Sequence, residues 1–198
     1  MIDKAAKSTM NKNAKLFILF AVIMLITFLS LKTIIQLSPY SPVNVHGASM
    51  APTLSDGDFI LIRSEAEKEI ARDQIALFSP AANWKLSMNQ SADASLLIKR
   101  IVGIPGDTVT YNDGTFSIVS KDGEKYSVAN SSIAQSQCAI QPGATITVGD
   151  NEYLLAGDNR AQSFDSFAAW CSSFDPIVKA SQIDVSGEIT LRFKALGG

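Results

Sequence analysis

The sequence is poor in residues that bind metals: its 198 residues include one histidine and two cysteines. With no Cys-x-x-Cys pair, this set does not supply the ligand cluster of a zinc site. Charged residues are also few, at 18% of the chain. From residue 33 onward there are 12 Lys and Arg against 18 Asp and Glu, a balance that does not suit binding to a nucleic-acid backbone. We therefore expect no metal, no small-molecule cofactor and no nucleic-acid partner.

A long apolar run lies near the N-terminus. Residues 16–31 contain no charged side chain, and the apolar character resumes after Lys32. A helix over 16–37 would be about 33 Å long, which is enough to cross a bilayer core. Four lysines and one aspartate precede it, so we expect residues 1–15 to be cytoplasmic. The chain would then be a single-pass protein of the cytoplasmic (inner) membrane, with its body on the periplasmic or extracellular side. A cleaved signal peptide is the alternative.

Short apolar segments separated by turn residues follow. The segments that read as strands are 58–63, 74–78, 96–104, 108–111, 115–119, 125–128, 145–148, 153–156 and 187–193. Turn signals such as Pro-Gly-Asp at 105–107 separate them. The pattern predicts a mainly β, antiparallel sandwich or barrel-like body. We expect residues 38–42, with two prolines, to be an extended connector, and the polar stretch 81–94 to be a mobile surface loop.

Ser49 is a candidate nucleophile. It lies in Gly-Ala-Ser-Met-Ala-Pro-Thr-Leu at 47–54, where Pro52 restricts the backbone. Backbone N–H groups in such a turn can face a developing oxyanion. A serine hydroxyl becomes a nucleophile only when a base removes its proton. The alternative is that Ser49 is an ordinary turn residue.

Lys99 is the candidate base, because it lies within the aliphatic segment 96–104. Burial is costly for an ammonium group, so a dry surrounding lowers the lysine pKa and leaves a neutral amine. The alternative is a lysine at a strand edge whose stem reaches toward water. His46, three residues before Ser49, is a second candidate base for a Ser-His-Asp triad. So short a separation makes it difficult for the imidazole to face the hydroxyl.

A third polar segment, Gly-Asp-Asn-Arg-Ala-Gln-Ser-Phe-Asp-Ser at 157–166, follows a predicted strand. It could be only a tight turn. In the functional interpretation, Ser163 would orient the lysine amine by a hydrogen bond and Asp165 would brace the loop. The two cysteines, Cys138 and Cys171, could close a loop of 33 residues or remain two buried thiols.

Together these segments resemble the type I signal peptidases, membrane-anchored Ser-Lys proteases. The matching motifs are Ser-Met-x-Pro-Thr-Leu at 49–54, Lys-Arg-Ile-Val-Gly-Ile-Pro-Gly-Asp at 99–107 and Gly-Asp-Asn-Arg-x-x-Ser-x-Asp-Ser at 157–166. They occur in the family's order after a single anchor. The family commonly has Arg directly after the last Asp-Ser pair, where it can bind the aspartate. Here that position is Phe167, so Asp165 needs another partner.

The resemblance implies roles for four polar residues. Ser49 would attack the scissile carbonyl with Lys99 as general base, while Ser163 orients the amine and Asp165 supports the loop. Three apolar side chains would line the substrate pockets: Met50, Leu97 and Ile98. The substrates would be preprotein signal peptides with small residues at the first and third positions before the cut. The enzyme would bind them at the lipid surface of the membrane.

The resemblance also implies a domain division. A catalytic β domain would comprise 38–110 and 150–198, and a smaller inserted β domain would comprise 111–149. Two other functions stay open from the sequence. One is a specialised conjugative or pilin-type maturation peptidase with the same chemistry, and the other is a membrane-anchored β-domain binding protein without catalysis.

Overall fold

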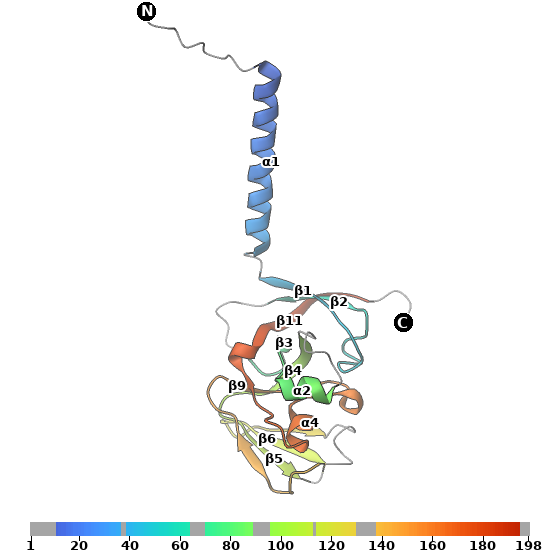
Figure 1. Ribbon diagram of the computed structural model, residues 1–198. Coiled ribbons are helices and arrows are strands. Elements are labelled where there is room, and N and C mark those ends of the chain that lie inside the picture. Colours follow the sequence, from blue (N-terminus) through green and yellow to red (C-terminus); the bar gives the residue numbers. More distant parts are fainter. Residues whose placement is uncertain are drawn as a thin grey trace, which may run out of the picture. The chain divides into compact units, whose positions relative to one another are not determined.

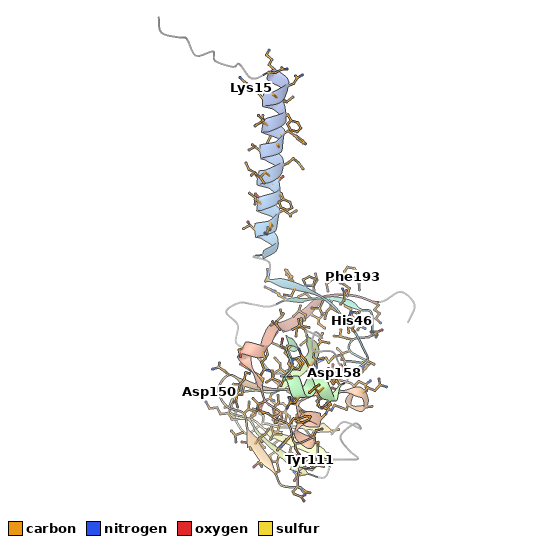
Figure 2. The ribbon with its side chains drawn as sticks, in the orientation of Figure 1. Lys15, His46, Tyr111, Asp150, Asp158 and Phe193 are labelled. Carbon is orange, nitrogen blue, oxygen red and sulfur yellow. A yellow bond between two sulfur atoms is a disulfide. The ribbon has the colours of Figure 1, made fainter. Side chains whose placement is uncertain are left out.

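The computed structural model describes residues 11–36, 39–63, 70–88, 96–112, 114–129 and 138–194. The chain divides into two units, Met1–Ser38 and Pro39–Gly198. The first contains helix α1 (Lys12–Gln36), whose described side chains, up to Thr33, are drawn in Figure 2. Its stretch Lys12–Thr33, with a mean hydropathy of 2.5, is long and apolar enough to cross a membrane. The predicted helix is confirmed and begins four residues earlier than expected.

The body is built from two antiparallel sheets (Figure 1). The larger sheet has the order β1-β2-β11-β3-β4-β9-β10. Its strands are β1 (Tyr40–Asn44), β2 (Phe59–Arg63), β3 (Ile75–Phe78), β4 (Leu97–Gly103), β9 (Glu152–Ala156), β10 (Val178–Lys179) and β11 (Ile183–Phe193). The smaller sheet has the order β7-β6-β5-β8. Its strands are β5 (Thr108–Asn112), β6 (Thr115–Val119), β7 (Lys125–Ala129) and β8 (Thr145–Thr147). The predicted mainly β, antiparallel body is confirmed.

Strand β1 lies where the sequence predicted only a connector. Tyr40–Asn44 pairs with β2 in antiparallel register, with Pro42 opposite Leu61. Proline cannot donate a ladder hydrogen bond, but β1 is an edge strand of its sheet, where one side of the backbone needs no partner. The two prolines therefore marked an edge strand and not the absence of a strand.

The prediction of a mobile loop over 81–94 is wrong for its first part. Residues Ala82–Ser87 form helix α2, and Trp84 on it is 1% exposed. The indole Nε1 donates to the Asp175 carbonyl at 3.1 Å, and the ring meets Phe78 and Phe164 edge-on. The buried ring of Trp84 thus fixes α2 against the body of the protein. Residues 89–94 lie outside the described part.

Helix α4 (Ser166–Cys171) joins the two sheets. The ring of Phe116 on β6 packs against Phe167 and Trp170, with centroid distances of 4.5 and 5.6 Å. A disulfide links Cys138 to Cys171, so the bonded alternative for the two cysteines is the one found. Two short 3-10 helices, Arg160–Gln162 and Ala180–Gln182, complete the described elements. The smaller sheet begins with β5 at Thr108, and the separate inserted domain over 111–149 stays a prediction.

Candidate active site

Ser49 and Lys99 meet although they are 50 residues apart in the chain. Ser49 lies in the loop between β1 and β2, and Lys99 lies in the middle of β4. The distance from Lys99 Nζ to Ser49 Oγ is 2.8 Å, a hydrogen bond. Strand β9 pairs antiparallel with β4, with Ala156 opposite Arg100, so the segment that follows β9 begins beside Lys99. The sheet thus brings together the three segments that the sequence singled out.

A buried ion pair stabilises the end of the loop that carries Ser49. The Asp58 side chain is 1% exposed and forms an ion pair with Arg192 of β11. The same carboxylate accepts the Ser55 N–H at 2.8 Å. At the other side of the loop, the Gly47 N–H donates to Asp56 at 2.7 Å. These bonds restrain the backbone on both sides of Ser49.

Asn159 holds the nucleophile from the opposite side. Its backbone N–H donates to the Ser49 carbonyl at 2.9 Å, and its Nδ2 donates to the Ala48 carbonyl at 3.0 Å. Its neighbour Asp158 forms an ion pair with Arg100, the residue after Lys99. Asp158 and Asn159 both lie within the motif at 157–166, but the sequence analysis assigned no role to them.

Gly157 permits the close approach of these segments. A Cβ at this position would lie 2.3 Å from Ser163 Oγ and 2.5 Å from the Ser49 carbonyl oxygen. Both distances are far below van der Waals contact, so any side chain would push the two segments apart. The glycine is required by packing between Ser49 and Ser163.

The Lys99 amine is almost dry. The residue is 3% exposed, and Nζ also donates to its neighbouring Ile98 carbonyl at 3.0 Å. Burial lowers the pKa of Lys99 from 10.5 to about 8. The charges of Asp165 and Asp158 act in the opposite direction, and that of Arg160 adds to the lowering. A pKa of about 8 leaves part of the lysine neutral and able to accept a proton near physiological pH.

Asp165 is buried at the centre of its loop. It is 0% exposed, and its Oδ2 accepts the Gly157 N–H at 3.0 Å. Its Oδ1 accepts the N–H groups of Phe167 and Ala168, which makes it the N-cap of α4. Arg160 forms an ion pair with it. Asp165 thus braces the loop. Its ion-pair partner is Arg160, since Phe167 carries no charge.

Ser163 lies in the site but has a different partner from the one we expected. Its hydroxyl is buried and donates to Asp165 Oδ2 at 2.8 Å. The hydrogen bonds of the Lys99 amine go to Ser49 and Ile98. An ionised carboxylate is a stronger acceptor than an amine, which explains why the hydroxyl turns toward Asp165.

A cavity of about 350 Å³ opens beside Ser49 and Lys99. Four residues give it apolar walls: Ala48, Met88, Leu97 and Phe164. Of the expected pocket residues, Leu97 lines this cavity, whereas Met50 and Ile98 are buried in a core cluster at 1% and 7% exposure. Alternation along β4 explains the position of Ile98, because residues 97 and 99 share one face of the strand and residue 98 points to the other.

His46 also lines the cavity, at the exposed surface of the loop after β1 (Figure 2). Within the part of the chain that the structure describes, no hydrogen bond joins His46 to Ser49. The hydroxyl instead meets the Lys99 amine. The geometry therefore favours lysine over histidine as the base.

Comparison with known proteins agrees with this geometry. Residues 14–193 match the family described as signal peptidase, peptidase S26. The chain is 32% identical over 137 residues to signal peptidase I of Bacillus amyloliquefaciens, covering 64% of this chain and 65% of that protein, slightly under two thirds of its length. It is 30% identical over 165 residues to signal peptidase I of Bacillus licheniformis, covering 81% and 82%.

A crystal structure of a signal peptidase I from Enterococcus faecalis V583 shares 23% identity and covers 60% of this chain and 96% of that one, with a TM-score of 0.35. The family match spans most of the chain, including all three motifs. The prediction of a serine endopeptidase of the signal peptidase I type is confirmed. The chain belongs to the signal peptidase family, peptidase S26.

Proposed function

We propose that this signal peptidase removes signal peptides from preproteins with Ser49 as nucleophile and Lys99 as general base. The observation that supports these roles is the 2.8 Å contact between the hydroxyl and an amine that is 3% exposed. A non-catalytic binding protein would not need a buried lysine facing a serine hydroxyl.

The reaction would follow from this pair in two stages. The neutral Lys99 amine takes the proton of Ser49 Oγ while Oγ attacks the scissile carbonyl carbon. The Ser49 N–H donates to the developing oxyanion. Collapse of the intermediate expels the new amine, which takes its proton from the Lys99 ammonium, and leaves an ester on Ser49. A water then attacks the ester and gives a proton to Lys99, and Lys99 passes this proton to the departing Ser49 Oγ, so the signal peptide is released and both residues return to their starting forms.

The cavity beside the pair would receive the side chain that precedes the scissile bond. Leu97, Met88 and Phe164 line it with apolar surface, which suits small uncharged side chains. Met50 and Ile98, which we expected to line the pocket, would act by supporting its walls from the core.

The membrane arrangement is also proposed. Helix α1 would anchor the chain in the cytoplasmic membrane, with the lysine-rich N-terminus inside and the body outside. The Cys138–Cys171 disulfide supports this orientation, because such bonds persist in oxidising compartments outside the cytoplasm.

The test is cleavage of a preprotein with alanine at the first and third positions before the cut. The full chain in detergent micelles should cut it at that bond, as shown by N-terminal sequencing of the product. Ser49→Ala should lose this activity, whereas Ser117→Ala, on the smaller sheet, should retain it. Cleavage by purified Ser49→Ala would exclude Ser49 as the nucleophile.

A further inference from the structure

Two carboxylates act on the Lys99 amine, and each is paired with an arginine. Asp165 and Asp158 both favour the charged form of Lys99. Asp165 pairs with Arg160, and Asp158 pairs with Arg100. The other titratable group on the same cavity is His46. The charge state of the amine therefore depends on how completely the two carboxylates are neutralised by their partners.

Arg160 is anchored from several directions. Its Nη1 pairs with Asp165, and its Nε donates to the Ala129 carbonyl at the end of β7 at 2.8 Å. Its guanidinium carbon lies 5.6 Å from the centroid of the Phe167 ring, a cation–π contact. The backbone of β7 and the first turn of α4 thus hold the guanidinium against the carboxylate.

The acceptor capacity of Asp165 is used up by these and neighbouring donors. Oδ2 receives the Gly157 N–H, the Ser163 hydroxyl and Arg160, and Oδ1 receives two N–H groups of α4. A carboxylate offers about four lone-pair sites. Asp165 therefore has no free site with which to bind the Lys99 amine, and no such bond is present among the described residues.

We propose that Arg160 is a positioning residue that keeps the Lys99 amine unprotonated, by holding the Asp165 carboxylate away from the amine and offsetting its charge. Phe167 occupies the position at which the resemblance led us to expect an arginine, and the cation that pairs with Asp165 is Arg160. The charge of Asp165 raises the pKa of Lys99, whereas that of Arg160 lowers it. The inference rests on the proposed function in one respect: Lys99 must be the base for catalysis to register the effect.

The test measures the Lys99 amine directly and through activity. In the full chain in detergent micelles, the Lys99 ¹⁵Nζ resonance, assigned by its loss in Lys99→Arg, is titrated alongside the pH profile of kcat/KM. Arg160→Gln should move both midpoints upward by at least about half a pH unit, because a compensating charge is lost in a site of low polarity. Arg160→Lys should shift them less, and Lys125→Gln, an exposed charge loss on β7, should shift neither.

A second variant removes both charges of the pair. Arg160→Gln combined with Asp165→Asn should bring the midpoint back to the parent value or below it, because the carboxylate that raises the pKa of Lys99 is then neutral as well. If Arg160→Gln alone does not fold, this double variant still decides, since a midpoint above that of the parent would contradict the proposal. An Arg160→Gln protein that folds and titrates Lys99 as the parent does would overturn it. If the resonance moves while the activity profile does not follow, the inference stands and the role of Lys99 as base fails.

Discussion

The backbone of Asn159 is bonded to the backbone of Ser49: the Asn159 N–H donates to the Ser49 carbonyl at 2.9 Å. The Asn159 side chain repeats the contact one residue earlier, on the Ala48 carbonyl. The nucleophile is therefore fixed through its main chain, which leaves its hydroxyl free to meet the Lys99 amine. Precise placement of the attacking oxygen is worth large factors in rate.

Asn159→Ala should consequently lower kcat while the protein stays folded. It removes the side-chain bond to Ala48 but leaves the backbone bond to Ser49. A lost hydrogen bond of this kind is worth about 1–2 kcal/mol, so we expect roughly a 5- to 30-fold loss in kcat with little change in KM. Steady-state cleavage of a peptide substrate measures both. Asn112→Ala, at the exposed end of β5, is the matched control, and equal rates for the two variants would contradict the role of Asn159.

The activity should rise with pH around the pKa of Lys99. Because burial lowers that pKa to about 8, the amine is neutral above this pH and charged below it. We expect kcat/KM to fall about tenfold per pH unit below the midpoint. His46→Ala should leave the midpoint in place, since no hydrogen bond joins His46 to the Ser49 hydroxyl in the described part of the chain. An inflection that disappears in His46→Ala would instead assign the profile to the imidazole.

Lys99→Arg should abolish cleavage at every pH in this range. A guanidinium keeps its proton under all working conditions and cannot act as the base. Circular dichroism and N-terminal sequencing would establish that the variant folds and leaves the precursor intact. Turnover comparable to that of the parent would reject lysine as the base.

Loss of the Cys138–Cys171 disulfide should destabilise the body. The bond closes a loop of 33 residues and ties α4 to the chain beside the smaller sheet. By chain entropy it contributes on the order of 3–4 kcal/mol. Cys138→Ser combined with Cys171→Ser should therefore melt at a lower temperature by calorimetry. Addition of dithiothreitol should lower the melting temperature of the parent but not that of the double variant.

Most of the strands, though not β1 and β10, were predictable because alternation and turn residues are local signals. The nine expected segments all contain strands. Antiparallel pairing of β4 and β9 places the second motif beside the third, and the hydrogen bonds of Asn159 join the first motif to them. Other features depend on contacts that no local pattern reports. Trp84 orders α2 through its contacts with the rings of Phe78 and Phe164, and Arg160 forms an ion pair with Asp165.

The sequence also did not show which face of β4 lines the cavity. In a run of aliphatic residues that is largely buried, the pattern does not show which side meets the cavity and which side meets the core. Leu97 lies on the cavity side with Lys99, while Ile98 packs with Met50 in the core. The partner of Ser163 was missed for a related reason, since the choice between an amine and a carboxylate depends on three-dimensional placement.

Lys99→Met should make the protein inactive and more stable. The pKa of Lys99 is about 8 in the folded protein and 10.5 ordinarily, so below pH 8 the fold bears the full cost of a buried ammonium. Between these two values the unfolded chain holds more protons than the folded one, and stability rises with pH. Replacing the ammonium by an apolar side chain of similar length should raise the free energy of unfolding at pH 7 on the order of 1–3 kcal/mol.

This gain should shrink as the pH rises from 8 toward 10.5, because the amine is already neutral in the folded protein, and it should approach zero only above 10.5, where the lysine is neutral in the unfolded chain as well. Thermal denaturation of the two proteins at pH 7 and pH 10 measures the difference, with Lys125→Gln as the exposed control. A Lys99→Met protein that is less stable than the parent at pH 7 would mean that the ammonium is well compensated. Burial of the Lys99 amine would then not lower the free energy of unfolding.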